Sequence, residues 1–239
     1  DRSVSRGLGD VYKRQILGNG SNIILPPYYD GIVIKLNNFD KLTIKDNEVV
    51  VESGYMFNKL SNELSNMGYT GYEWSVGIPG TVGGCIYNNA GAYKMSVSDL
   101  LISVTVLKNN EIIELPSSEC NFGYRTSLFK EEKDYIILSC RLKIHKGNID
   151  EIKFLINDRT KRRIETQPLN YPSCGSVFRN PDSISAGKLI EDLGLKGYSI
   201  GGACVSTLHA NFIINKDNAS GEDIICLLYT SPSPRDTER

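Results

Sequence analysis

Glycine is concentrated in three short segments of the first half of this chain, at residues 18–22, 77–84 and 88–93. Glycine adopts positive φ values and allows a ligand to approach the backbone closely. Successive free N–H groups in such turns form concave anion sites, a geometry that suits a pyrophosphate. One such segment is more often an ordinary turn, but three in one domain predict that the backbone holds a long dinucleotide along its length.

The first of these segments does not match the common nucleotide-binding fingerprints. It reads Gly-Asn-Gly-Ser-Asn and lies between two short apolar runs, at residues 16–17 and 23–25, which we expect to be strands. A Rossmann fold needs G-x-G-x-x-G before a helix, and a P-loop needs G-K-[ST]. Neither pattern is present at this loop. Side chains of Ser21, Asn22 and Thr81 add polar donors beside the glycines.

Composition excludes several other classes of protein. The 239 residues suffice for one large domain or two modest ones. A net charge of -1 gives no overall attraction for nucleic acid or an anionic membrane. The six cysteines form no C-x-x-C pair and there are two histidines, so we expect no metal site and free, buried thiols.

No apolar run reaches the ~20 residues that a transmembrane helix needs. We therefore expect a cytoplasmic protein without membrane insertion, and nothing in the sequence implies a nucleic-acid or protein partner.

The spacing of apolar residues predicts an α+β fold. A hairpin is expected across Asn109-Asn110, because these residue types tolerate the positive φ values of a tight turn. Glycines that follow apolar-periodic runs predict helix ends at Gly68 and Gly194. Strands are expected at 32–36, 48–53, 104–108, 112–115, 135–144, 203–206 and 210–214, and helices at 57–67, 149–167 and 186–193.

A change of character near residues 146–147 predicts two domains. Residues 16–146 are richer in glycine and strands, whereas residues 147–228 begin with a charged amphipathic helix. Residues 1–15 carry four basic side chains without apolar periodicity, and residues 229–239 are rich in proline, serine and charge. Such composition cannot bury a core face. We expect both ends to be foreign to the folded chain, or else disordered termini.

Six motifs in order link the chain to a known family: ILGNGSNIIL, EWSVGIPGTVGGCIYNNAGAY, FGYRTSLF, PSCGSVFRNP, AGKLIEDLGLKGYSIGGACVSTLHANFIIN and NASGEDI. In order and spacing they resemble the motifs of UDP-N-acetylenolpyruvoylglucosamine reductases over residues 16–228. The short stretch between Arg125 and Ser176 resembles the shorter, second type of that family.

The resemblance implies an FAD-binding domain of the vanillyl-alcohol-oxidase type, followed by a smaller α+β substrate-binding domain. It also implies non-covalent FAD, with NADPH as co-substrate and a UDP-sugar as substrate. The residues that it implies for binding the flavin cofactor are Gly18, Asn19, Gly20, Ser21, Asn22, Gly77, Ile78, Pro79, Gly80, Thr81, Gly83, Gly84, Asn89, Ala90 and Gly91.

Arg125 and Ser176 are the residues that the resemblance implies for catalysis. A guanidinium is permanently charged and suits the carboxylate on which negative charge develops when an enolpyruvyl ether is reduced. A positioned serine hydroxyl suits proton delivery to the neighbouring carbon, provided that a neighbour polarises it. Tyr124, Asn180 and His209 are expected near the substrate, although Asn180 and His209 are equally well explained as structural polar groups.

Other basic residues have simpler explanations. Lys188 and the run Arg159, Lys161, Arg162 and Arg163 are expected on solvated helix faces, although this run could steer a diphosphate.

The family's third catalytic residue, a glutamate, follows the segment that NASGEDI resembles. The chain departs from the family pattern after Leu228, and Glu238 lies in no matching motif. We therefore expect a fragment with an incomplete first domain at its N-terminal side and an incomplete second domain at its C-terminal side. We expect such a fragment to be impaired or inactive.

Two other functions remain open at this point. One is an FAD-dependent oxidase of the same fold; His145 and His209 lie outside the glycine segments, which argues against covalent flavin attachment through histidine. The other is a flavin-binding module that has lost its chemistry. The presence of Arg125 and Ser176 argues against such a module, whereas the missing glutamate favours it.

Overall fold

The computed structural model describes residues 14–181 and 183–230, and they divide into two compact units. Of the described residues, unit 1 contains 14–20 and 28–153, and unit 2 contains 21–27 and 154–230 without residue 182. The division runs through helix α5 (Ile149–Thr166). The domain boundary that the sequence suggests, between residues 146 and 147, stays a prediction.

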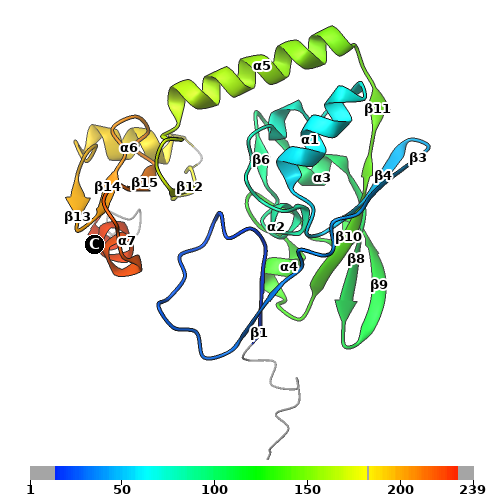
Figure 1. The fold of residues 1–239 in the computed structure, drawn as a ribbon, viewed down its shortest axis with the longest axis horizontal. Coiled ribbons are helices and arrows are strands. Elements are labelled where there is room, and N and C mark those ends of the chain that lie inside the picture. Colours follow the sequence, from blue (N-terminus) through cyan, green and yellow to red (C-terminus); the bar gives the residue numbers. More distant parts are fainter. Residues whose placement is uncertain (1–13, 182, 231–239) are drawn as a thin grey trace, which may run out of the picture. The chain divides into compact units, whose positions relative to one another are not determined.

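An antiparallel five-stranded sheet forms the centre of unit 1 (Figure 1). Its strand order is β3 (Leu42–Lys45), β4 (Glu48–Glu52), β10 (Ile136–Lys143), β8 (Leu101–Lys108) and β9 (Glu111–Pro116). The strands expected around β4, β8, β9 and β10 are confirmed, whereas β3 was not expected. Val49 and Val51 on β4 are fully buried and Val50 between them is 38% exposed, because successive strand side chains point to opposite faces.

Smaller elements of unit 1 surround this sheet. β1 (Arg14–Leu17) pairs in parallel with β2 (Ile32–Lys35), β5 (Tyr69–Thr70) pairs with β11 (His145–Lys146), and β6 (Gly91–Ala92) pairs with β7 (Met95–Ser96). The helices are α1 (Phe57–Asn66), α2 (Val82–Tyr87), α3 (Val97–Leu100) and α4 (Leu128–Glu131), with 3-10 turns at Glu73–Ser75 and Ser117–Glu119.

Helix α1 confirms the helix expected at residues 57–67. Leu60 and Leu64 are fully buried on its inner face, and Gly68 follows with a φ of 78°. Met67, which we expected on the same face, is 49% exposed, because the helix ends at Asn66 and Met67 is already its C-cap. Phe57 at the helix start packs against Trp74, with ring centroids 5.7 Å apart.

The strand expected at residues 23–25 is wrong: this stretch has no regular structure and belongs to unit 2. β1 starts at Arg14, and α7 (Gly221–Thr230) includes two residues of the expected foreign tail. The rest of the two ends, at residues 1–13 and 231–239, lies outside the described residues.

Unit 2 is a smaller α+β arrangement. Its sheet has the order β12 (Ser173–Ser176), β15 (Phe212–Asn215), β14 (Ala203–Val205) and β13 (Ser199–Ile200), and all three strand pairs are antiparallel. Helix α6 (Ala186–Asp192) is capped by Ser185 and followed by Gly194 at a φ of 69°. The core contains Ile190, Val205 and Leu227, which are at most 7% exposed. The helices and strands expected at 149–167, 186–193, 203–206 and 210–214 are confirmed.

The six cysteines are free thiols, as the composition predicted. Four are buried, whereas Cys174 is half-buried and Cys226 is exposed. Burial raises the pKa of the Cys85 thiol to about 12 and also raises the pKa of Cys140, so both remain protonated at neutral pH. Over the described residues, no helix is both long and apolar enough to cross a membrane, and no cluster of three potential metal ligands occurs.

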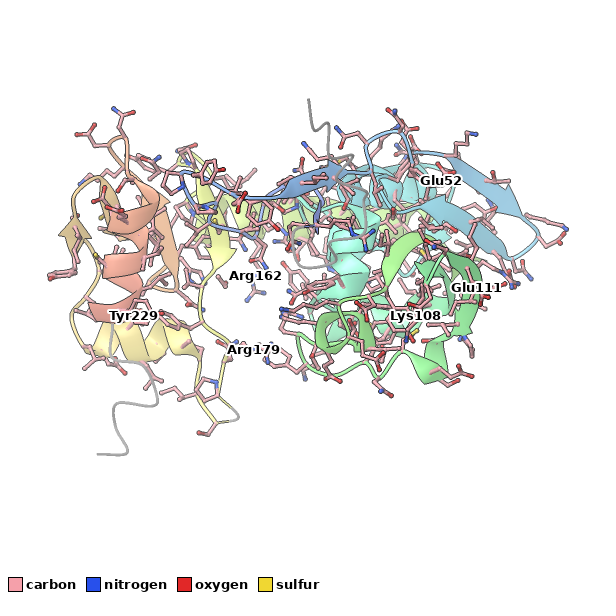
Figure 2. The ribbon with its side chains drawn as sticks, turned by 90° about the horizontal axis from the view of Figure 1, so that it is seen from below. Glu52, Lys108, Glu111, Arg162, Arg179 and Tyr229 are labelled. Atoms are coloured by element: carbon pink, nitrogen blue, oxygen red, sulfur yellow. The ribbon has the colours of Figure 1, made fainter. Side chains whose placement is uncertain are left out.

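The expected hairpin across Asn109-Asn110 is confirmed, and it generates a test of the local fold. The φ values of these residues are 50° and 64°, and Lys108 pairs with Glu111 beside the turn (Figure 2). Left-handed φ values of both central residues are those of a type I′ turn.

We predict that Asn110→Val lowers the free energy of unfolding of unit 1 by about 1–2 kcal/mol, because a β-branched residue is strained at this φ. Asn110→Gly should keep or raise that free energy. Urea unfolding followed by the fluorescence of Trp74, the single tryptophan and a core residue of unit 1, measures the change. Asn47→Val, at an exposed turn position without positive φ, is the control. Equal stabilities of the two valine variants would contradict the turn assignment.

Candidate flavin site and catalytic residues

The second glycine segment is fixed by backbone pairing with the end of β4 and the start of α1. Gly80 O accepts from Phe57 N, Val82 N donates to Tyr55 O, and Gly83 N donates to Ser53 O, at 2.8–2.9 Å. A Cβ at Gly83 would lie 2.9 Å from Ser53 Cβ, so only glycine allows this approach. The pairing sets where α2 begins and how the rest of the segment is presented.

The first glycine loop lies against this segment. Asn19 Nδ2 donates to Pro79 O at 2.7 Å. A Cβ at Gly18 would lie 2.8 Å from Thr81 Oγ1, so the two segments touch at this glycine. The structure therefore brings together Gly18, Asn19 and Gly20 with the predicted residues of 77–84. Ser21 and Asn22 are not part of this group, because residues 21–27 belong to unit 2.

The predicted cofactor residues form two sets, which differ in whether their backbone N–H groups have an acceptor within the protein. Among the described residues, no protein acceptor takes the backbone N–H of Asn19, Gly20, Gly77, Gly80 or Thr81. Val82, Gly83 and Gly84 already donate their N–H groups, the last to the capping Oγ1 of Thr81 at 3.3 Å, and Ile78 donates to Ser75 O.

Backbone donors are normally paired, so a cluster without acceptors suits an anionic ligand. The N–H groups of the first set are available to a pyrophosphate. Those of the second set are already bonded within the protein and fix the backbone conformation. Gly77, Pro79 and Gly84 are exposed, so this part of the surface is accessible.

The third glycine segment is bonded to the turn that carries Arg125. Asn89 is buried, and its amide donates from Nδ2 to Gly123 O at 3.0 Å while its Oδ1 accepts from Ser98 N at 3.2 Å. Gly91 has to be glycine, because a Cβ there would lie 2.4 Å from Met95 O. Asn89 thus bonds the third glycine segment to the turn that carries Arg125.

Arg125 is held in an uncommon backbone conformation. Its φ is +59°, inside a tight turn closed by two backbone bonds between Gly123 and Thr126. Its guanidinium donates to Asn89 O at 3.2 Å and Gly91 O at 2.6 Å, and lies 5.1 Å from the ring centroid of Tyr124. A non-glycine residue with positive φ is costly and is often found at functional sites. Tyr124 itself is 56% exposed.

In unit 2, Ser176 ends β12 opposite Phe212 and is exposed. Gly175 before it has a φ of 80° and interrupts the regular pairing of the strand. In the described part of the chain, the Ser176 hydroxyl makes no hydrogen bond. The polarising neighbour that a serine acid needs is therefore not supplied by these residues of unit 2.

Asn180 and His209 have structural partners in unit 2. Asn180 Oδ1 accepts from Ala186 N at 3.0 Å and so supports the start of α6. His209 Nδ1 accepts from Asn211 N at 3.2 Å, and its ring lies 4.7 Å from that of Phe212. Burial lowers the pKa of His209, so the imidazole is neutral at pH 7 and supplies no cation to a diphosphate. Their expected substrate contacts stay predictions.

Asn211 is a site residue that our reading of the sequence missed. It is buried, and its side chain clamps the backbone of Phe178: Oδ1 accepts from Phe178 N and Nδ2 donates to Phe178 O, both at 2.9 Å. Its own carbonyl accepts from Val177 N. The clamp fixes the chain just after Ser176. The sequence did contain a signal for this role, because Asn211 is a polar residue inside the apolar run 210–214.

In the basic run on α5, Lys161 and Arg162 are exposed as expected, whereas Arg159 and Arg163 are half-buried. Arg162 on α5 and Arg179 beyond β12 extend from the same side of unit 2 in Figure 2. Lys188 is exposed and forms an ion pair with Asp192 on the same helix, as expected for a solvated face.

Comparisons with known proteins agree with this arrangement. Residues 12–115 match a family model described as an FAD binding domain, and residues 167–230 match the C-terminal domain of UDP-N-acetylenolpyruvoylglucosamine reductase. The predicted α+β class with a flavin-binding domain is confirmed.

The UDP-N-acetylenolpyruvoylglucosamine reductase of Clostridium beijerinckii is 42% identical over 216 residues, covering 90% of this chain and 71% of that protein. The protein of the same name from Caldanaerobacter subterraneus is 43% identical over 215 residues, covering 89% and 71%. The crystal structure of UDP-N-acetylenolpyruvylglucosamine reductase from Thermus caldophilus matches with a TM-score of 0.81 at 31% identity, over 92% of this chain and 80% of that one.

The clamp at Asn211 generates a prediction. Asn211→Leu removes both partners of the Phe178 backbone, which should cost about 1–3 kcal/mol for each group left unpaired. Hydrogen-exchange mass spectrometry should show faster exchange in the peptide 173–180. Asn170→Leu, at an exposed position of the same unit, is the control and should leave this peptide unchanged. Equal exchange in the two variants would show that Asn211 does not hold this segment.

Proposed function

This chain belongs to the UDP-N-acetylenolpyruvoylglucosamine reductase family, and we propose the residues through which it performs the family's reaction. It is an NADPH-dependent flavoprotein oxidoreductase with FAD as cofactor. Its reaction reduces UDP-N-acetylenolpyruvoylglucosamine to UDP-N-acetylmuramate, a step in the synthesis of peptidoglycan precursors. The observation that carries the assignment of residues is the cluster of backbone N–H groups without acceptors in unit 1.

These donors would hold the FAD pyrophosphate. Asn19 and Gly20 supply them from the first loop, and Gly77, Gly80 and Thr81 supply them from the second. Phosphate oxygens would satisfy N–H groups that otherwise depend on water. The proposed FAD-binding set also includes the other predicted residues, such as Ser21, Asn22 and Ala90. For these residues, no unpaired backbone N–H supports the proposal. FAD held by the proposed set would supply hydride transfer from NADPH to the substrate.

We propose that Arg125 pairs with the substrate carboxylate. The two backbone carbonyls that its guanidinium contacts fix its plane, and a guanidinium has five N–H donors to share. Fixed positive charge aimed at a developing anion is usually the largest catalytic contribution. Tyr124, whose ring lies beside the guanidinium, would contact the substrate from the same turn.

We propose that the Ser176 hydroxyl delivers the proton that completes the reduction. Its exposure at a strand end leaves the hydroxyl accessible, and the Asn211 clamp fixes the following residues. Asn180 and His209 are proposed as substrate contacts of the same unit. We further propose non-covalent flavin, a cytoplasmic location, and no partner other than its small-molecule ligands.

Anaerobic visible spectroscopy of the purified chain loaded with FAD tests the function. NADPH should bleach the flavin, and UDP-N-acetylenolpyruvoylglucosamine should then restore the oxidised spectrum. Bleached flavin that persists after substrate addition would contradict the proposed reductase. Oxygen consumption with a sugar or hydroxy acid would support an oxidase of the same fold, and flavin binding without either reaction would support a non-catalytic flavin-binding module.

Replacement of Ser176 tests its role within this reaction. Ser176→Ala should slow flavin reoxidation by substrate about 10²–10⁴-fold, the usual contribution of a positioned proton donor. Bleaching by NADPH should keep the wild-type rate. Ser173→Ala, on the same strand and also exposed, is the control and should keep both rates. Wild-type reoxidation by Ser176→Ala would exclude the serine as the proton donor.

A further inference from the structure

Several side chains bond residues 87–91 to residues 123–130 within unit 1. Asn89 Nδ2 donates to Gly123 O, Arg125 donates to Asn89 O and Gly91 O, and Ser127 Oγ donates to Tyr87 O at 2.7 Å. Lys130, on α4, adds one more bond between the segments, to Asn88, and a second bond to Arg125 O within its own segment. Four side chains thus join the third glycine segment to the arginine turn.

The Lys130 ammonium group donates to two kinds of acceptor, a side-chain amide oxygen and a backbone carbonyl. Its Nζ donates to Asn88 Oδ1 at 2.9 Å, at the start of the third glycine segment. The same Nζ donates to the backbone carbonyl of Arg125 at 3.2 Å. The side chain is half-buried, so water competes less for these bonds than at an open surface. A hydrogen bond from a charged donor is also stronger than a neutral one.

The carbonyl that Lys130 holds belongs to the one residue of the turn with a left-handed backbone. Arg125 has a φ of +59°, which non-glycine residues adopt at a cost and keep only when the surroundings enforce it. Bonds to its guanidinium fix the side chain, and bonds between Gly123 and Thr126 close the turn. The bond from Lys130 fixes the peptide plane that directly follows the Arg125 Cα.

We propose that Lys130 is a positioning residue for Arg125, fixing its backbone and the orientation of its guanidinium for the substrate carboxylate. The proposal rests on the proposed function, because it needs Arg125 to act on the substrate. Lys130 acts through Arg125 and contacts neither the substrate nor the reacting atoms. Its removal should therefore weaken substrate binding and the oxidative half-reaction, because an error of about 1 Å in placing a catalytic group costs about a hundredfold in rate.

Lys130→Met is the test variant, and Lys133→Met, at an exposed position three residues later, is its matched control. In stopped-flow measurements, we expect Lys130→Met to reoxidise flavin with substrate about 10- to 100-fold more slowly than the control. Flavin content and bleaching by NADPH should match the control. Hydrogen exchange of the peptide 122–128 should be faster in Lys130→Met, a readout independent of activity. If Lys130→Met does not fold, Lys130→Gln, which keeps a donor nitrogen, takes its place.

A double-mutant cycle separates positioning from a purely structural role. In an Arg125→Ala background, Lys130→Met should change the reoxidation rate less than about threefold, because the group that it positions is absent. Two outcomes would overturn the proposal: reoxidation by Lys130→Met at the rate of the control, or a full loss that persists in the Arg125→Ala background. Failure of the wild-type chain to reoxidise its flavin with substrate would instead contradict the proposed function, so the two failures are distinguishable.

Discussion

The proposed flavin site depends on one short backbone pairing, between residues 53–57 and 80–83. Three backbone hydrogen bonds make up this pairing: Phe57 N to Gly80 O, Val82 N to Tyr55 O, and Gly83 N to Ser53 O. Because N–H groups alternate in direction along an extended chain, the pairing leaves the Thr81 N–H facing away from the partner segment. The same pairing starts α2 and closes the core above β4. The start of α2 and the unpaired N–H of Thr81 are thus consequences of a single constraint, and the glycine at 83 permits it.

Polar contacts hold the two proposed catalytic residues, each within its own unit. In unit 1, buried Asn89 and the bonds around Arg125 hold a left-handed arginine beside the third glycine segment. In unit 2, buried Asn211 performs the same kind of task for the chain that follows Ser176. An asparagine amide can donate and accept at once, so Asn211 bonds both the N–H and the C=O of Phe178, and Asn89 bonds Gly123 O and Ser98 N. Both proposed catalytic residues therefore lie next to backbone that is held by a buried amide.

Much of this was predictable from local sequence signals, and the failures have physical causes. The glycines at 68 and 194, the Asn109-Asn110 turn and the apolar periodicity of α1 are local features, so the corresponding elements were predicted correctly. Residues 23–25 have strand-like composition but find no strand partner, because pairing is decided by distant parts of the chain. Sequence spacing also could not show which glycine N–H groups are already bonded, nor that Asn211 faces Phe178. The motifs identified the candidate residues; only the fold shows which atoms remain available.

Amide exchange with and without FAD tests the central claim, that backbone donors left unpaired by the fold hold the pyrophosphate. On addition of FAD, the amides of Asn19, Gly20, Gly77, Gly80 and Thr81 should gain protection. The amides of Val82, Gly83 and Gly84, which are already bonded within the protein, should change little. Protection confined to the second group, or no protection in either glycine segment while FAD is bound, would contradict this account.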